Sequence, residues 1–178
     1  MRTTWRWPRD HDEGDLIVSE MDEVIPALVA AVQEQHATGD HYRDDAIRQA
    51  MEHQAQLALR PGPVRVDVIV DPPWSDGQIN SVQVVTGDRP FLVDTVASCL
   101  LRHGWRVEDV RHPIIGVKRD RGTIEAVGMP GRGGCASESW IHIDATAPLG
   151  TDIGQAAEQL RDDLCACLDP VSYTHLTL

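Results

Sequence analysis

Residues 81–118 read SVQVVTGDRPFLVDTVASCLLRHGWRVEDVRHPIIGVK, and this stretch decides the fold. The valines that precede Gly87 predict a strand, because β-branched side chains pack well on a pleated surface. The turn that follows is suited to starting a helix. Asp88 offers a carboxylate to the unpaired N–H groups of a first helical turn, where Pro90 loses little by lacking a donor.

The residues after this turn predict one amphipathic helix followed by strands. Apolar side chains recur at i, i+3, i+4 and i+7 between Val93 and Leu100, and Gly104 supplies the left-handed conformation that ends a helix. Trp105–Val110 and Ile114–Lys118 are strand segments separated by a proline, which indicates a bulge or an edge position. This βαβ start has no phosphate-binding glycine run and no evident catalytic group. We therefore interpret it as part of a regulatory or structural module.

Two amphipathic segments lie upstream of this stretch. Residues 21–32 and 42–59 show helical periodicity and predict a helical hairpin, whose first helix we expect to become regular near Pro26. Residues 64–70 predict a half-buried strand, because apolar and polar residues alternate at its start. Residues 1–15 are polar apart from two tryptophans, and we expect them to be loose.

Two strands and a helix follow downstream. Thr123–Val127 and Trp140–Ala145 predict strands separated by a glycine-rich loop. Ile153–Leu168 carries a continuous apolar helical face, with Thr151 as its expected cap. These elements together predict an α+β fold. Either its sheet is incomplete after the last helix, or the strand at residues 64–70 takes the place of a final strand.

The composition is that of an ordinary globular domain with an acidic balance. Of 178 residues, 42% are hydrophobic and 25% are charged, and the formal net charge is −12. That charge argues against non-specific nucleic-acid binding, which needs a basic surface, and against binding to an anionic membrane. No apolar run is long enough to span a bilayer. The four cysteines are few and irregularly spaced, which favours reduced thiols in a cytoplasmic protein.

Three groups of residues are candidates for chemistry, and each has a plainer interpretation. Gly128–Gly134 matches neither glycine fingerprint for nucleotides, so we interpret it as a hairpin loop. Cys135 has no evident orienting base, and we expect an exposed loop cysteine rather than a nucleophile. Cys165 and Cys167 point about 200° apart on a helix, which is poor geometry for a zinc ion shared with His142.

Three further polar residues lie close to the turn at the start of the central helix. His112 precedes a proline within a strand, and we interpret it as a structural histidine. Arg89 and Asp94 flank the first helical turn. They form either a solvated pair or the lining of an effector or subunit contact.

Longer strings of residues resemble a known family. In three motifs this chain resembles the N-terminal ACT-like region of the large bacterial NAD-specific glutamate dehydrogenases. The motifs occur here in the same order, between residues 84 and 144. The motifs are VVTGDRPFLVDTV at residues 84–96, HPIIGVKRD at 112–120 and ESWIHID at 138–144.

The resemblance implies a particular fold and a candidate site. The fold is an N-terminal helical hairpin plus an ACT-like, ferredoxin-like antiparallel sheet with two helices on one face. The site is an effector or interface turn made of Gly87, Asp88, Arg89, Pro90 and Phe91. ACT domains that bind a free amino acid commonly have glycine after the proline, where this chain has Phe91. We therefore expect the turn to be an interface or a structural cap rather than a tight amino-acid site.

The resemblance also suggests how the chain is organised. We divide it into an N-terminal helical segment (residues 1–60), an ACT-like domain (61–170) and a tail (171–178). The tail, VSYTHLTL, resembles the translation of a sequencing adapter, so we leave it out of the fold; the alternative is a genuine C-terminal tail. We expect the chain to be a fragment of a longer protein.

By resemblance, the chain is a non-catalytic regulatory or assembly region of an NAD-dependent glutamate dehydrogenase, which oxidises L-glutamate to 2-oxoglutarate and ammonia. No catalytic, cofactor-binding or metal-binding residue is expected here, and NAD is expected to bind the parent enzyme beyond Pro170. The implied partners are the rest of the dehydrogenase chain, further copies in a homo-oligomer and an amino-acid effector. The alternatives are a free-standing ACT-type amino-acid sensor and, more remotely, a cysteine hydrolase acting through Cys135.

Overall fold

The computed structural model describes residues 16–17, 21–35, 44–75 and 77–169. The expectations for residues 1–15 and for the tail at 171–178 lie outside these ranges. The described residues form helices and strands in this order: β1 (Leu16–Ile17), α1 (Met21–Gln35), α2 (Asp44–Ala58), β2 (Val64–Ile69), β3 (Asn80–Gly87), α3 (Leu92–Arg102), β4 (Arg106–Arg111), β5 (Ile114–Asp120), β6 (Thr123–Gly128), β7 (Ala136–Thr146) and α4 (Ile153–Leu168).

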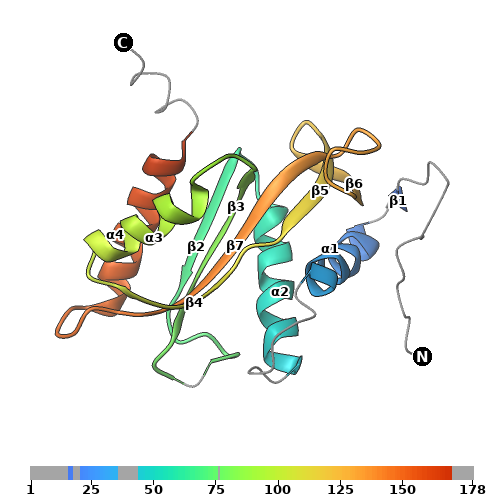
Figure 1. Ribbon diagram of the computed structural model, residues 1–178. Coiled ribbons are helices and arrows are strands. Elements are labelled where there is room, and N and C mark those ends of the chain that lie inside the picture. The colour runs from blue at the N-terminus through green and yellow to red at the C-terminus, as the bar shows by residue number, and fades with distance from the viewer. Residues whose placement is uncertain (1–15, 18–20, 36–43, 76, 170–178) are drawn as a thin grey trace, which may run out of the picture.

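One antiparallel sheet organises these elements. Its strands follow the order β1-β6-β5-β7-β3-β2, and β4 also pairs with β7. Helices α3 and α4 cover one face of the sheet, and α1 and α2 lie against the other (Figure 1). The predicted α+β class is therefore confirmed, with helices on both faces. Among the described residues no helix is long and apolar enough to cross a membrane.

β2, the predicted strand at residues 64–70, forms one edge of the sheet. β2 pairs antiparallel with β3, from Val64 opposite Thr86 to Ile69 opposite Ser81. Helix α4 packs over β2. An upstream strand thus occupies the edge where a final strand after α4 would lie, which agrees with the second of the two alternatives. The order β2-β3-β7-β4 with α3 and α4 on one face is consistent with an ACT-like arrangement.

The core under α3 and α4 comes from alternate residues of the central strands. Val84 lies opposite Ile141, and both are completely buried, as are Val96 and Leu100 of α3. The remaining buried members of this core are Val66, Val82, Leu92, Cys99, Trp105, Ile143, Ala145, Ala157, Leu160, Leu164 and Leu168. The predicted apolar face of the central helix is thus correct at Val96 and Leu100, whereas Val93 is only partly buried.

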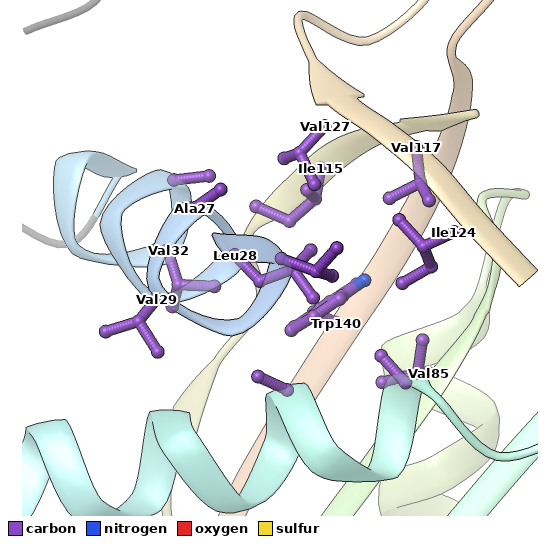
Figure 2. Close-up of a cluster of buried hydrophobic side chains, with 14 of the residues drawn as sticks. Ala27, Leu28, Val29, Val32, Val85, Ile115, Val117, Ile124, Val127 and Trp140 are labelled. Carbon is purple, nitrogen blue, oxygen red and sulfur yellow. The ribbon is translucent and has the colours of Figure 1, made fainter. Parts of the chain in front are cut away.

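A second core lies between the sheet and the pair α1 and α2. Trp140 is completely buried at its centre, where Leu28 of α1 approaches it (Figure 2). Val85 lies opposite Trp140 in the β3–β7 pair and points to this same face. Helices α1 and α2 also pack against each other. Because both contribute to this core, the predicted helical pair packs on the sheet and does not stand apart from it.

Gly116 in β5 lies so close to the backbone of residues 128 and 129 that no side chain fits there. A Cβ atom on Gly116 would lie 2.4 Å from the carbonyl oxygen of Gly128 and 2.5 Å from the carbonyl carbon of Met129. These atoms belong to the end of β6, which pairs with β5 at this point, and to the loop that leads on to β7. Only a residue without a side chain lets the two backbones approach so closely.

Three local predictions are wrong. Helix α1 runs through Pro26 instead of becoming regular there. The cap of α4 is Asp152, whose carboxylate accepts a hydrogen bond from the backbone N–H of Gln155 at 3.1 Å, while the hydroxyl of Thr151 donates to the Pro148 carbonyl. Cys135 is buried, with 3% exposure, because its Sγ packs close to Gly128.

Candidate functional site

The turn between β3 and α3 has an unusual backbone. Phe91 is the N-cap residue of α3 and has φ 65° and ψ 16°, in the left-handed region that favours glycine. Both the backbone N–H and the hydroxyl of Thr95 donate to the carbonyl oxygen of Phe91, at 2.9 and 2.8 Å. These two hydrogen bonds hold the first turn of α3 in place. The backbone geometry is therefore one that favours glycine, although the residue here is phenylalanine.

The side chain of Phe91 lies on the surface. It is 76% exposed, unlike Leu92, which is buried in the core beneath α3. A phenyl ring with that exposure does not cap the hydrophobic core of its own module. Two roles were expected for Phe91. Its high exposure does not support the role of structural cap, and its contact with another surface stays a prediction.

Asp88 does not cap α3, contrary to the sequence prediction. Its Oδ1 atom accepts a hydrogen bond of 2.6 Å from the hydroxyl of Ser139 in β7, and its backbone N–H donates to the carbonyl of Ser137 at 2.9 Å. Helix α3 begins only at Leu92 and has no side-chain cap. A residue distant in the sequence thus competes successfully for the carboxylate that the local pattern assigns to the helix.

His112 joins the same hydrogen-bonded chain. Its Nε2 atom lies 2.9 Å from the Ser139 hydroxyl. Because that hydroxyl gives its only proton to Asp88, Nε2 must be the donor to its oxygen, which places the proton of the neutral imidazole on Nε2. Burial lowers the pKa of His112, although the charge of Asp88 opposes this. His112 is therefore a neutral histidine that helps to orient Asp88, in line with its expected structural role.

An open cavity of about 380 Å³ lies at this turn. That volume is at the lower end of the range for small-molecule sites. The cavity brings together four of the five predicted site residues, and Gly87 is not part of its lining. Its lining residues are Asp88, Arg89, Pro90, Phe91, Leu92, Val93, Asp94 and His112.

Arg89 connects the turn to the far end of α4. One of its Nη atoms donates a hydrogen bond to the carbonyl oxygen of Leu168, the last residue of that helix. A cation is favourable at a helix C-terminus, where unpaired carbonyl groups carry partial negative charge. The sequence did not predict this contact within the chain. Arg89 and Asp94 both line the cavity, and their role in an effector or subunit contact stays a prediction.

Sequence reasoning missed a buried polar network beneath α2. The side-chain amide of Gln83 in β3 donates to the Ala50 carbonyl of α2 at 2.8 Å and to Nδ1 of His142 in β7 at 3.0 Å. Its carbonyl oxygen lies 2.8 Å from Nδ1 of His53, and Nε2 of His142 lies 2.9 Å from a carboxylate oxygen of Asp144. Both nitrogens of His142 therefore have partners, and its neutral form carries the proton on Nε2.

Electrostatics keep His142 neutral. It is 4% exposed, and burial lowers its pKa below 6.5 even though Asp144 favours the charged form. Arg111 pairs with Asp144 at 2.8 Å and disfavours a second positive charge nearby. Gln83 and the neutral ring of His142 thus belong to a hydrogen-bonded bridge between α2 and the sheet.

The structure separates the cysteines and the histidine that were considered as zinc ligands. His142 faces α2, whereas Cys165 and Cys167 belong to α4 on the opposite side of the sheet. In the described part of the chain, no three histidine, cysteine or acidic side chains are grouped so that they could hold a metal ion. Residues 129–135 form a turn-rich loop between β6 and β7, but the predicted hairpin is wrong, because β5 lies between these two strands in the sheet.

The sheet with two helices on one face is consistent with an α+β domain of ACT type, and the cavity lies at one of its strand–helix turns. The chain belongs to a family of ACT domains. Residues 27–164 match the family described as glutamate dehydrogenase, ACT1 domain. No protein with a curated description matches the chain.

Proposed function

We propose that this chain is the N-terminal, non-catalytic regulatory or assembly region of an NAD-dependent glutamate dehydrogenase. The family match over residues 27–164 is the observation that carries the proposal. In the parent enzyme, L-glutamate is converted to 2-oxoglutarate and ammonia while NAD is reduced, and the residues that bind NAD lie beyond Pro170. The parent is a cytoplasmic homo-oligomer in this proposal.

The exposed ring of Phe91 supports a role in assembly. An aromatic side chain with 76% exposure, beside an open cavity, offers a large apolar surface for another part of the enzyme. The hydrogen bonds from Thr95 fix the backbone that presents this ring, so little conformational entropy remains to be lost on contact. The neighbour is the rest of the dehydrogenase chain or a second copy of it.

The deciding experiment compares full-length parent enzyme with and without the ring. Phe91→Ala should shift the oligomer distribution in analytical ultracentrifugation toward smaller species and leave the melting temperature of the isolated chain within a few degrees. The isolated chain should form no NADH from glutamate and NAD. An unchanged oligomer distribution would contradict the assembly role, and NADH formation by the isolated chain would contradict its non-catalytic character.

The cavity at the turn favours a second candidate, a free-standing amino-acid sensor. Asp88 and Asp94 line it, and a carboxylate can bind the ammonium group of an amino acid. Calorimetric titration of the chain with a panel of amino acids separates the two functions. Micromolar binding that Asp88→Ala abolishes would favour the sensor, whereas no heat of binding would favour the assembly region.

A further inference from the structure

Helices α3 and α4 lie side by side and run in opposite directions. At one end, Arg89 before α3 bonds the carbonyl of Leu168, the last residue of α4. At the other end, His103 after α3 lies 2.7 Å from a carboxylate oxygen of Asp163, one turn earlier in α4. The segment between these two anchors holds Cys99 of α3 and two cysteines of α4, Cys165 and Cys167.

The thiols of Cys99 and Cys167 lie near one arginine. Nη2 of Arg102 donates to Sγ of Cys167 at 3.4 Å. Cys99 lies three residues before Arg102, so it is on the same side of α3 as the guanidinium that bonds Cys167. Cys99 is completely buried against the α4 side of the core, whereas Cys167 is partly exposed. One sulfur is therefore accessible to a small reagent, and the second lies behind it.

We propose that Cys167 and Cys99 form an oxidation site that hydrogen peroxide converts into a disulfide between α4 and α3. Cys167 is the more accessible of the two sulfurs, and its thiolate is the form that attacks the peroxide. Burial raises the pKa of the Cys99 thiol, so Cys99 is the poorer first nucleophile. Cys167 therefore reacts first and Cys99 resolves the product.

The reaction proceeds in two balanced steps. The Cys167 thiolate attacks one peroxide oxygen and breaks the O–O bond, which gives a sulfenic acid and hydroxide; the hydroxide takes up the proton that Cys167 had released. The sulfur of Cys99 then attacks the sulfenic sulfur and displaces the hydroxyl group, which leaves as water with the Cys99 proton. Two thiols are oxidised, one hydrogen peroxide is reduced, and two waters form.

The disulfide would fasten α3, which carries Leu92, Val93 and Asp94 of the turn cavity, to α4. It would close a long loop from residue 99 to residue 167, and cross-links over long loops restrict the unfolded chain most. Oxidation should therefore raise the melting temperature of the chain by several degrees. Reduction with dithiothreitol should reverse that rise.

The chain offers a matched control on the same helix. Cys165 is exposed and lies two residues before Cys167, on a different side of α4. The reduced full chain is treated with hydrogen peroxide, alkylated and digested, and the peptides are analysed by mass spectrometry. We expect a cross-linked pair containing Cys99 and Cys167 in wild-type protein and in Cys165→Ser, and no such pair in Cys167→Ser.

A variant of Arg102 tests separately whether this arginine positions the Cys167 sulfur. Because the Arg102 guanidinium holds the Cys167 sulfur against α3, Arg102→Gln should lower the rate of cross-linking several-fold, whereas alkylation of the exposed Cys165 should proceed at the wild-type rate. Arg106→Gln, at an arginine that pairs with Glu108 in β4, serves as the charge-matched control and should oxidise at the wild-type rate. If the wild-type protein yields only over-oxidised cysteines or Cys165-linked dimers, the proposal is wrong.

Discussion

The left-handed backbone of Phe91 leads to a prediction in which glycine and alanine behave differently. A left-handed conformation costs a residue with a Cβ atom about 1–2 kcal/mol relative to glycine. Phe91 has φ 65°, so the native state bears this cost, and Phe91→Ala leaves it in place. Phe91→Gly removes it, although the more flexible unfolded chain takes back about 0.5–1 kcal/mol.

Loss of the ring contributes equally in both variants. With 76% exposure, the ring buries only about a quarter of its ~200 Å², roughly 50 Å², which corresponds to about 1 kcal/mol. Phe91→Ala should therefore lose about 1 kcal/mol of unfolding free energy. Phe91→Gly should be more stable than Phe91→Ala by about 0.5–1 kcal/mol and lie near the wild type.

Thermal melts of the purified chain test this order. For a chain of this size, 1 kcal/mol corresponds to about 2–4 °C, so Phe91→Gly should melt roughly 1–4 °C above Phe91→Ala. If alanine is as stable as glycine, the left-handed conformation carries no strain, and the reasoning fails. A large loss in both variants would mean that the ring is buried. Because both variants lack the ring, they should impair assembly of the parent enzyme equally despite their different stabilities.

Three further predictions concern the core, a buried histidine and the glycine contact. Leu100→Asp should unfold or aggregate the chain, because an unpaired buried charge costs several kcal/mol, whereas Leu101→Asp, on the next residue at 65% exposure, should melt close to wild type. The free energy of unfolding should fall as the pH drops below about 6.5, because burial lowers the pKa of His142 in the folded state and the unfolded chain therefore binds more protons. Denaturant titrations at several pH values should show a weaker pH dependence for His142→Gln than for wild type. Gly116→Ala should destabilise by about 1–3 kcal/mol, since its Cβ would collide with backbone, whereas Gly87→Ala, which meets nothing within 4 Å, should stay within about 0.5 kcal/mol by calorimetry.

The elements that the sequence predicts well are those with strong local periodicity. Val96 and Leu100 recur at helical spacing, so they could be assigned to a buried face, and the apolar runs that contain Val84 and Ile141 predict strands. The place of β2 was only one of two alternatives, because strand pairing depends on contacts outside the strand itself.

The errors arise where a distant residue competes with a local pattern. Asp88 precedes a helical pattern as a cap residue does, yet α3 begins only at Leu92, and the hydroxyl of Ser139 donates to the Asp88 carboxylate. Gln83 and His142 alternate with apolar residues and so resemble a solvent-facing row, but α2 covers them and supplies polar groups of its own. The loop around Cys135 is rich in glycine, which usually indicates exposure, yet its sulfur is buried. No local signal reveals such pairings.

The use of β2 as an edge strand also has a consequence for the order of folding. β2 and β3 are joined only by residues 70–79, so they can pair as a hairpin before the rest of the sheet exists. A final strand after α4 would instead have to close a loop of about eight times that length, which costs about 2 kcal/mol more in chain entropy. Contacts between nearby segments speed folding. The hairpin can therefore serve as an early template on which β7 adds from the far side.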